Sequence, residues 1–280
     1  MRPVDPALSA IRTLAADEFR TAFRGSLIPG TAALFGLIAL GISLAGLGAS
    51  GSVVLQGYAR TSVSILGLAL YVVPLLGLLA GSTALSRSRG EMELLLAQPV
   101  DRREILVGRW LGLAAALAVG IGAGFAVPGI AVAVIAGGAG ILAYLLVVLG
   151  SLYLCVVALG AGTLVGVGAP GRGAAVARAV GVWLAAVILY DLGAIGLLQI
   201  LGDGQPGPAL LALLVLNPID AVRTVVLYAL GAETLLGPSG MALRRMLTGP
   251  GAVALLGCTF VGWLVIPAAA AFRRFMRRDY

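Results

Sequence analysis

Long apolar runs alternate with short charged segments along the whole chain. A helix that crosses a membrane needs about 20 mostly apolar residues, and the charge-free run 110–171 is long enough for two. A glycine-rich patch at 137–140 divides this run, because clustered glycines interrupt a helical pattern. The pattern therefore predicts an all-α, polytopic membrane protein with six transmembrane helices. The predicted spans are 25–48, 61–84, 110–134, 139–163, 179–201 and 249–272.

The N-terminal segment 1–24 has a different pattern from the spans. Leu8, Ile11 and Phe19 fall on one helical face, with Asp17 and Arg20 opposite them. This pattern predicts an amphipathic helix over 5–24 that lies on the cytoplasmic membrane surface. The expected units are therefore this N-terminal helix (1–24), the membrane domain (25–272) and a basic cytoplasmic tail (273–280).

Residues 202–248 are apolar enough to suggest a seventh span, but turn signals interrupt them. Asn217 is a good N-cap, Pro218 suits the first helical position, and Asp220 follows three residues after the cap. The preceding segment 209–216 is too short to cross a bilayer. We expect two short helices on the outer face that dip into the membrane interface, or else a plain capped surface helix. The residues assigned to the outer-face helix are Asn217, Pro218, Asp220 and Arg223.

The composition supports the membrane assignment and predicts its orientation. Apolar residues make up 60% of the chain, and all 19 basic residues are arginine. Cytoplasmic loops carry an excess of basic residues, and with the N-terminus inside, 15 arginines lie on the inner side and four on the outer. We therefore expect a multi-pass protein of the inner membrane with both termini cytoplasmic. Because the arginines sort by membrane side, the net charge of +7 does not indicate a nucleic-acid partner.

The residue types also exclude several kinds of chemistry. Without lysine the chain has no P-loop lysine for ATP phosphates, and without histidine it lacks a common zinc ligand. Cys155 and Cys258 lie in separate apolar segments, and the spans hold no nucleophile paired with a base. We expect no enzymatic activity, no catalytic residue, no metal site and no cofactor bound by this chain.

Four Gly-x-x-x-Gly pairs begin at Gly77, Gly108, Gly120 and Gly162. Small residues at this spacing let membrane helices approach one another closely. With 41 glycines in the chain, we expect close helix packing but assign no pair to a partner.

Asp191 is the one acidic residue in the middle of an apolar span. A carboxylate at that depth costs about 2.5–3.5 kcal/mol on insertion scales, so the side chain is expected to face protein or water. Two interpretations stay open: a substrate contact or conformational latch, and a packing residue at a subunit interface. Tyr190 and Gln199 are the nearby candidates for a hydrogen bond with it.

The segment 87–109 is the most charged part of the chain, with nine charged residues between two charge-free runs. Gly90 interrupts the helix that leaves the second span, and Pro99 ends a short helix over 91–98. Asp101 is predicted to cap a second helix, with Glu104 completing a capping box. A short helix held along the membrane between two spans is suited to transmit force from a soluble partner. The alternative is a solvated cytoplasmic loop with no further role.

The same segment resembles the cytoplasmic signature of ABC-2-type transporter permeases. The matching stretches are Gly90-Glu-Met-Glu-Leu-Leu-Leu-Ala-Gln-Pro-Val-Asp-Arg and Ile105-Leu-Val-Gly-Arg-Trp-Leu-Gly. The family has threonine where Glu91 stands and acidic residues where 86–89 reads Ser-Arg-Ser-Arg. The resemblance implies the ABC-2 (type V exporter-like) fold and a loop, within 85–109, that packs onto a separate ATP-binding subunit. The implied ATPase-coupling residues are Gly90, Glu91, Glu93, Leu94, Leu95, Pro99, Arg102 and Arg103.

Further stretches resemble the NosY-like subfamily. Its members are membrane subunits of the NosDFY transporter, which supports copper-site maturation of nitrous oxide reductase. They are Val73-Pro-Leu-Leu, Gly181-Val-Trp, Tyr190-Asp-Leu and Leu216-Asn-Pro-Ile-Asp-Ala-Val-Arg. NosY-like proteins often carry Tyr-Asp where this chain has Gly81-Ser82.

The resemblance implies three partners: an ATP-binding subunit that holds ATP and magnesium, a second permease copy in a homodimer, and a periplasmic NosD-like protein. An ABC-2 permease that exports a drug, a lipid or another small molecule is the alternative function. A secondary carrier is less favoured, because such carriers have several intramembrane charges or paired broken helices, and here only Asp191 is seen.

Overall fold

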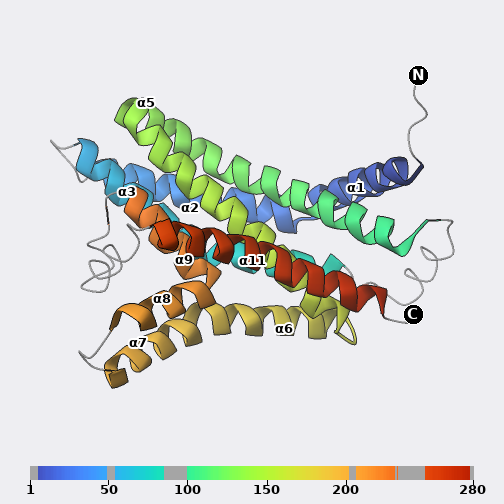
Figure 1. The fold of residues 1–280 in the computed structure, drawn as a ribbon. Helices are drawn as coiled ribbons and strands as arrows, with labels where there is room; N and C mark the ends of the chain where they lie inside the picture. The colour runs from blue at the N-terminus through green and yellow to red at the C-terminus, as the bar shows by residue number, and fades with distance from the viewer. Residues whose placement is uncertain are drawn as a thin grey trace.

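The computed structural model describes residues 6–48, 54–84, 100–201, 206–230, 232 and 250–277, and every regular element in these ranges is helical (Figure 1). The coupling residues expected at Gly90, Glu91, Glu93, Leu94, Leu95 and Pro99 lie outside the described residues. The elements are α1 (Pro6–Arg24), α2 (Leu27–Gly48), α3 (Val54–Ala84), α5 (Arg102–Val167), α6 (Arg172–Leu184), the π-helix η1 (Ala185–Leu189), α7 (Tyr190–Leu201), α8 (Pro206–Leu216), α9 (Pro218–Ala229) and α11 (Pro250–Met276).

Among the described residues, five helical segments are long and apolar enough to cross a membrane: Ser62–Ala84, Arg102–Ile130, Tyr144–Val167, Arg172–Ile200 and Ala254–Met276. Two bent pairs raise the number to as many as seven if each pair is one span. Ala7–Arg24 meets Ile28–Ile42 at a bend of 57°, and Pro208–Leu216 meets Pro218–Ala229 at a bend of 113°. The chain is therefore a multi-pass membrane protein with five to seven candidate spans.

The helix α5 folds back on itself, although its helical hydrogen bonding continues from Arg102 to Val167. The Tyr144 hydroxyl donates to the carbonyl oxygen of Phe125 at 2.7 Å, and the two rings are 5.9 Å apart. In a straight helix, residues 19 positions apart would be separated by about 28 Å. The chain therefore reverses between Ile130 and Tyr144, which agrees with the division expected at the glycine-rich patch. Figure 1 shows the two arms of α5 side by side.

One end of the bundle collects most of the arginines, and we call it the arginine-rich end. Leu106 near the start of α5, Val167 at its end and Phe275 near the end of α11 form one buried cluster there. The helix α1 lies beside the same turns of α5, so both chain termini approach this end (Figure 1). The turn between the arms of α5 marks the opposite end (Figure 1).

The continuous segment α6–η1–α7 is peripheral, since only 6% of its most apolar window is buried. Ala179 packs with Leu78 of α3, and Trp183 Nε1 donates to the carbonyl oxygen of Tyr71 at 2.9 Å. Many other side chains of this segment, such as Leu189, Leu192 and Ile200, are exposed and available to lipid or to another protein chain.

Glycines bring α3 and the second arm of α5 into backbone contact. A Cβ added at Gly162 would lie 2.8 Å from Leu78 Cα, and one added at Gly166 would lie 2.8 Å from Ser82 Cα. Any side chain at these positions would overlap the facing helix. The expected close helix packing therefore occurs, and the structure assigns its partners.

The variant Gly162→Ala tests this contact against the matched control Gly181→Ala, because a Cβ at Gly181 would meet nothing within 4 Å. Both substitutions gain the same intrinsic helix preference of about 1 kcal/mol, so their difference reports packing. We expect Gly162→Ala to be less stable than the control by about 1–3 kcal/mol, the usual cost of overpacking. Denaturant unfolding of the protein in detergent micelles measures this difference, and equal stabilities would contradict the contact.

Candidate functional site

The site begins at the vertex between α8 and α9, where the chain bends by 113°. Asn217 leaves the helical region there, with φ −127° and ψ 114°, and its Oδ1 accepts a hydrogen bond from the Ile219 amide at 3.0 Å. Pro218 occupies the first position of α9, where its missing N–H costs no helical hydrogen bond. The N-cap and the proline therefore have the local roles that the sequence predicts.

The vertex also contacts the peripheral span, a partner that the sequence did not indicate. Asn217 Nδ2 donates to the carbonyl oxygen of Ala186 at 2.9 Å, and Ala186 lies near the middle of the candidate span Arg172–Ile200. The vertex therefore contacts the peripheral span near the middle of its length. The wider π-helical turn at Ala185–Leu189 contains the accepting carbonyl.

The end of α8 is held by side chains from two other helices. The last carbonyls of a helix lack intrahelical partners, and Pro218 supplies no N–H to continue the pattern. The Tyr190 hydroxyl of α7 donates to the carbonyl oxygen of Leu213, and Trp263 Nε1 of α11 donates to that of Val215 at 2.9 Å. Tyr190 thus anchors the end of α8 rather than pairing with its neighbour Asp191.

Charged groups join the vertex to the same peripheral span. Arg223 Nη1 lies 2.9 Å from Asp220 Oδ1 within α9 and 3.6 Å from Asp191 Oδ2 of α7. Asn217 Nδ2 also donates to Asp220 Oδ2 at 3.2 Å. These three side chains, with Asp191 and the Ala186 carbonyl, form what we call the polar joint.

The polar joint unites residues that the sequence placed in two separate groups. Asp191 was expected to use Tyr190 or Gln199, but its partner is Arg223, which is distant in sequence. The Ala186 carbonyl was missed altogether, because no sequence pattern marks a π-helical turn in an apolar span.

The polar joint links the α8–α9 vertex to the peripheral span through hydrogen bonds and ionic contacts, which can break and form again. Each of its five groups donates a hydrogen bond, accepts one or carries a charge, and none is a nucleophile activated by a base. The described ranges contain no group of three or more Cys, Asp or Glu side chains that could hold a metal ion. Breaking the contacts of Asn217 and Arg223 would loosen the vertex, although Tyr190 of the same span also contacts the end of α8.

At the arginine-rich end, α5 begins at Arg102, as the sequence predicts. The Asp101 amide donates to Glu104 Oε2 at 3.3 Å, which is the reciprocal half of a capping box. Arg102 and Arg103 therefore occupy the first turn of α5, directly after the segment 85–99.

Glu18 is a residue of this end that sequence reasoning missed. Its Oε2 lies 3.7 Å from Arg109 Nε, and both side chains are at most 10% exposed. Against expectation, α1 also packs on protein along one side, since a Cβ at Gly108 would lie 2.7 Å from Leu14 Cβ. The glycine spacing in α5 makes room for α1 and brings Glu18 to the arginine.

Comparison with known proteins identifies the family. The family described as "ABC-2 family transporter protein" matches residues 7–280. The chain belongs to the ABC-2 transporter family. Such permeases work with a separate ATP-binding subunit, and the family is generally non-catalytic.

Two curated relatives of this ABC-2 permease carry the name "Probable ABC transporter permease protein NosY". The relative from Stutzerimonas stutzeri is 29% identical over 281 residues, which are 97% of this chain and 99% of the relative. The relative from Pseudomonas aeruginosa is 31% identical over 238 residues, which are 80% of this chain and 84% of the relative. The likeness therefore extends over nearly the full length of the permease.

Substitutions at Asn217 separate its two local roles. Asn217→Ala removes both the cap and the bond to Ala186, whereas Asn217→Ser keeps a capping oxygen that is too short to reach Ala186. We expect Asn217→Ser to lose about 1–3 kcal/mol for the buried carbonyl left unpaired, and Asn217→Ala to lose about 1 kcal/mol more for the cap. Denaturant unfolding in detergent measures both values. Wild-type stability of Asn217→Ser would mean that the contact with Ala186 contributes nothing.

Proposed function

We propose that this ABC-2 permease is a NosY-type membrane subunit that couples ATP hydrolysis on a partner subunit to transport or delivery at its periplasmic side. The process it serves is the maturation of the copper enzyme nitrous oxide reductase. Support comes from two relatives named NosY at 29% and 31% identity. The described residues hold no cluster of metal ligands, so the proposal assigns motion to this chain and metal ligation to other proteins.

In this proposal the arginine-rich end faces the cytoplasm of a cell with an inner membrane. Apart from Arg60 and Arg223, the described arginines belong to segments that meet at this end. The positive-inside rule favours that side for such an end. The opposite end, from which α8 and α9 enter the bundle, then faces the periplasm and a NosD-like partner.

In the proposed mechanism the ATP-binding subunits act on the segment 85–99, which precedes Arg102 and the first turn of α5. Closure of the ATP-binding subunits pushes this segment and with it the start of α5. The buried Glu18–Arg109 pair makes α1 move together with that turn, because separating two buried charges costs several kcal/mol. A second permease copy completes the transporter as a homodimer.

In this proposal the movement reaches the opposite end through the hairpin of α5. Its second arm contacts α9 closely, since a Cβ at Gly150 would lie 2.8 Å from Val222 Cγ1. A cavity of about 240 Å³ lies between α9, α5 and α11 and is lined by apolar side chains such as Val226 and Phe260. The contact at Gly150 can therefore pass a displacement of the α5 arm to α9, and the cavity leaves room for the two helices to shift against each other.

The polar joint is the observation that carries the proposal. It fastens the vertex of α8 and α9 to the middle of the peripheral span through a hydrogen bond and ionic contacts. Partly buried ion pairs of this kind are weak enough to open during a transport cycle. Opening the joint loosens the vertex against the peripheral span, and closing it restores the barrier at the outer half of the permease.

Deletion of the gene for this chain in its own host tests the process it serves. We expect the deletion strain to lose nitrous oxide consumption, and the purified reductase to lose copper, while a plasmid copy of the wild-type gene restores both. A strain that keeps a copper-loaded reductase but accumulates a lipid or becomes sensitive to a drug would contradict the proposal. That second result would favour the alternative exporter function.

Variants of the joint test the mechanism separately. Asp191→Asn and Arg223→Gln each remove one side of the same contact, so each is expected to reduce complementation by roughly tenfold, the effect of about 1.4 kcal/mol on a rate. The double variant is expected to be no worse than either single variant, because both act on one interaction. Gln199→Ala, which changes an exposed polar residue of the same span, is the control. Full activity of both single variants would contradict the proposal that opening and closing of the polar joint controls transport.

A further inference from the structure

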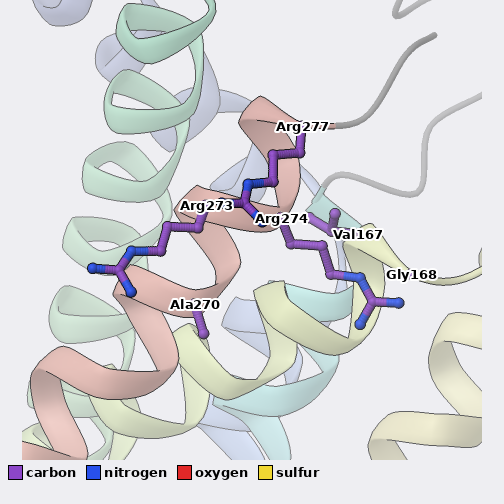
Figure 2. A pocket seen from close by; sticks show the side chains of 6 residues that line it. All are labelled: Val167, Gly168, Ala270, Arg273, Arg274 and Arg277. Carbon is purple, nitrogen blue, oxygen red and sulfur yellow. The ribbon is translucent and has the colours of Figure 1, made fainter.

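A basic pocket lies between the end of α11 and the loop that follows α5. Its volume is about 660 Å³, and Figure 2 shows the arginine side chains fanning out from the last turns of α11. The two helices that border it, Tyr144–Val167 and Ala254–Met276, are candidate spans that end at this level. The pocket therefore lies where these helices leave the apolar layer. Its lining residues are Val167, Gly168, Ala270, Arg273, Arg274 and Arg277.

Gly168 organises one wall of the pocket. A Cβ at this position would lie 2.6 Å from Arg274 Nη2, so the guanidinium packs directly over the glycine, as Figure 2 shows. Arg178 Nη1 donates to the carbonyl oxygen of Gly168 at 2.7 Å. The loop thus gathers a further positive charge beside the three that line the pocket.

The arginines of this pocket have no carboxylate partner in the described part of the chain. Several guanidinium groups around one cavity repel each other, and an anion bound between them removes that repulsion. The guanidinium group presents a planar fork of donors that matches the oxygens of a phosphate. The chemistry of the pocket therefore fits a phosphate group.

We infer that the basic pocket binds the phosphate of an acidic phospholipid headgroup, such as that of cardiolipin or phosphatidylglycerol. The apolar side chains of Val167 and Ala270 line the same cavity, and they suit a ligand whose phosphate continues into acyl chains. Basic pockets between transmembrane helices on the cytoplasmic side bind lipid headgroups of this kind. A free phosphate shares the ionic contacts but has no apolar part for these two side chains.

The test is lipid binding by the full-length permease in nanodiscs of phosphatidylcholine with or without cardiolipin. Cardiolipin retention is measured by native mass spectrometry, and thermal stability is measured in both lipid mixtures. We expect cardiolipin to be retained and to stabilise the wild-type protein, whereas inorganic phosphate added to phosphatidylcholine nanodiscs does not. Stabilisation by inorganic phosphate alone would identify the ligand as the free ion and overturn the lipid assignment.

Arg273→Gln and Arg274→Gln remove charges from the pocket, and Arg12→Gln removes an exposed charge from α1 at the same end. Each pocket variant is expected to bind cardiolipin about fivefold more weakly, following the usual contribution of one arginine near an anionic surface, while Arg12→Gln binds like wild type. Equal cardiolipin binding by all three variants would contradict the inference. Loss of the co-purified ATP-binding subunit with unchanged cardiolipin binding would show instead that the pocket contacts protein.

Discussion

The bend between α8 and α9 leaves backbone groups without partners in their own helices, and side chains and carbonyls of neighbouring helices supply those partners. Asn217 caps α9 and reaches Ala186, while Tyr190 and Trp263 take up carbonyls at the end of α8. Within a membrane protein, such a break is tolerated where neighbouring helices satisfy its backbone groups. These hydrogen bonds fix the position of the vertex. The contact with the peripheral span and the proposed opening of the polar joint depend on that position.

The permease has a closely packed body and a more exposed peripheral span. Glycine positions let α1, α3 and the arms of α5 touch backbone to backbone, so these helices are expected to move as one body. The peripheral span has few buried residues, whereas α9 packs into the core through Val222 and Val226. The chain therefore combines a rigid body of closely packed helices with a lightly attached outer element, and the polar joint lies between them.

Local patterns in the sequence predict local structure well. Hydropathy indicates helical segments for α3, both arms of α5, the peripheral span and α11, and the capping rules give Asn217, Pro218 and the start of α5. The partners in long-range contacts do not follow from spacing. Nothing near Asp191 in the chain indicates Arg223, nothing near Arg109 indicates Glu18, and a π-helical turn has no composition of its own. These contacts arise only when the helices are placed side by side.

The proposed mechanism requires the α8–α9 pair to move against the peripheral span when the ATP-binding subunits close. Spin labels at Ile195 and Ala229, both exposed, report the distance between the two elements, with the exposed Cys258 replaced by serine. Double electron–electron resonance on the assembled transporter, without nucleotide and trapped with ATP and vanadate, measures that distance. If the α8–α9 pair moves, the two states give two different distance distributions. One unchanged distribution in both states, in a transporter that still hydrolyses ATP, would contradict the proposed mechanism.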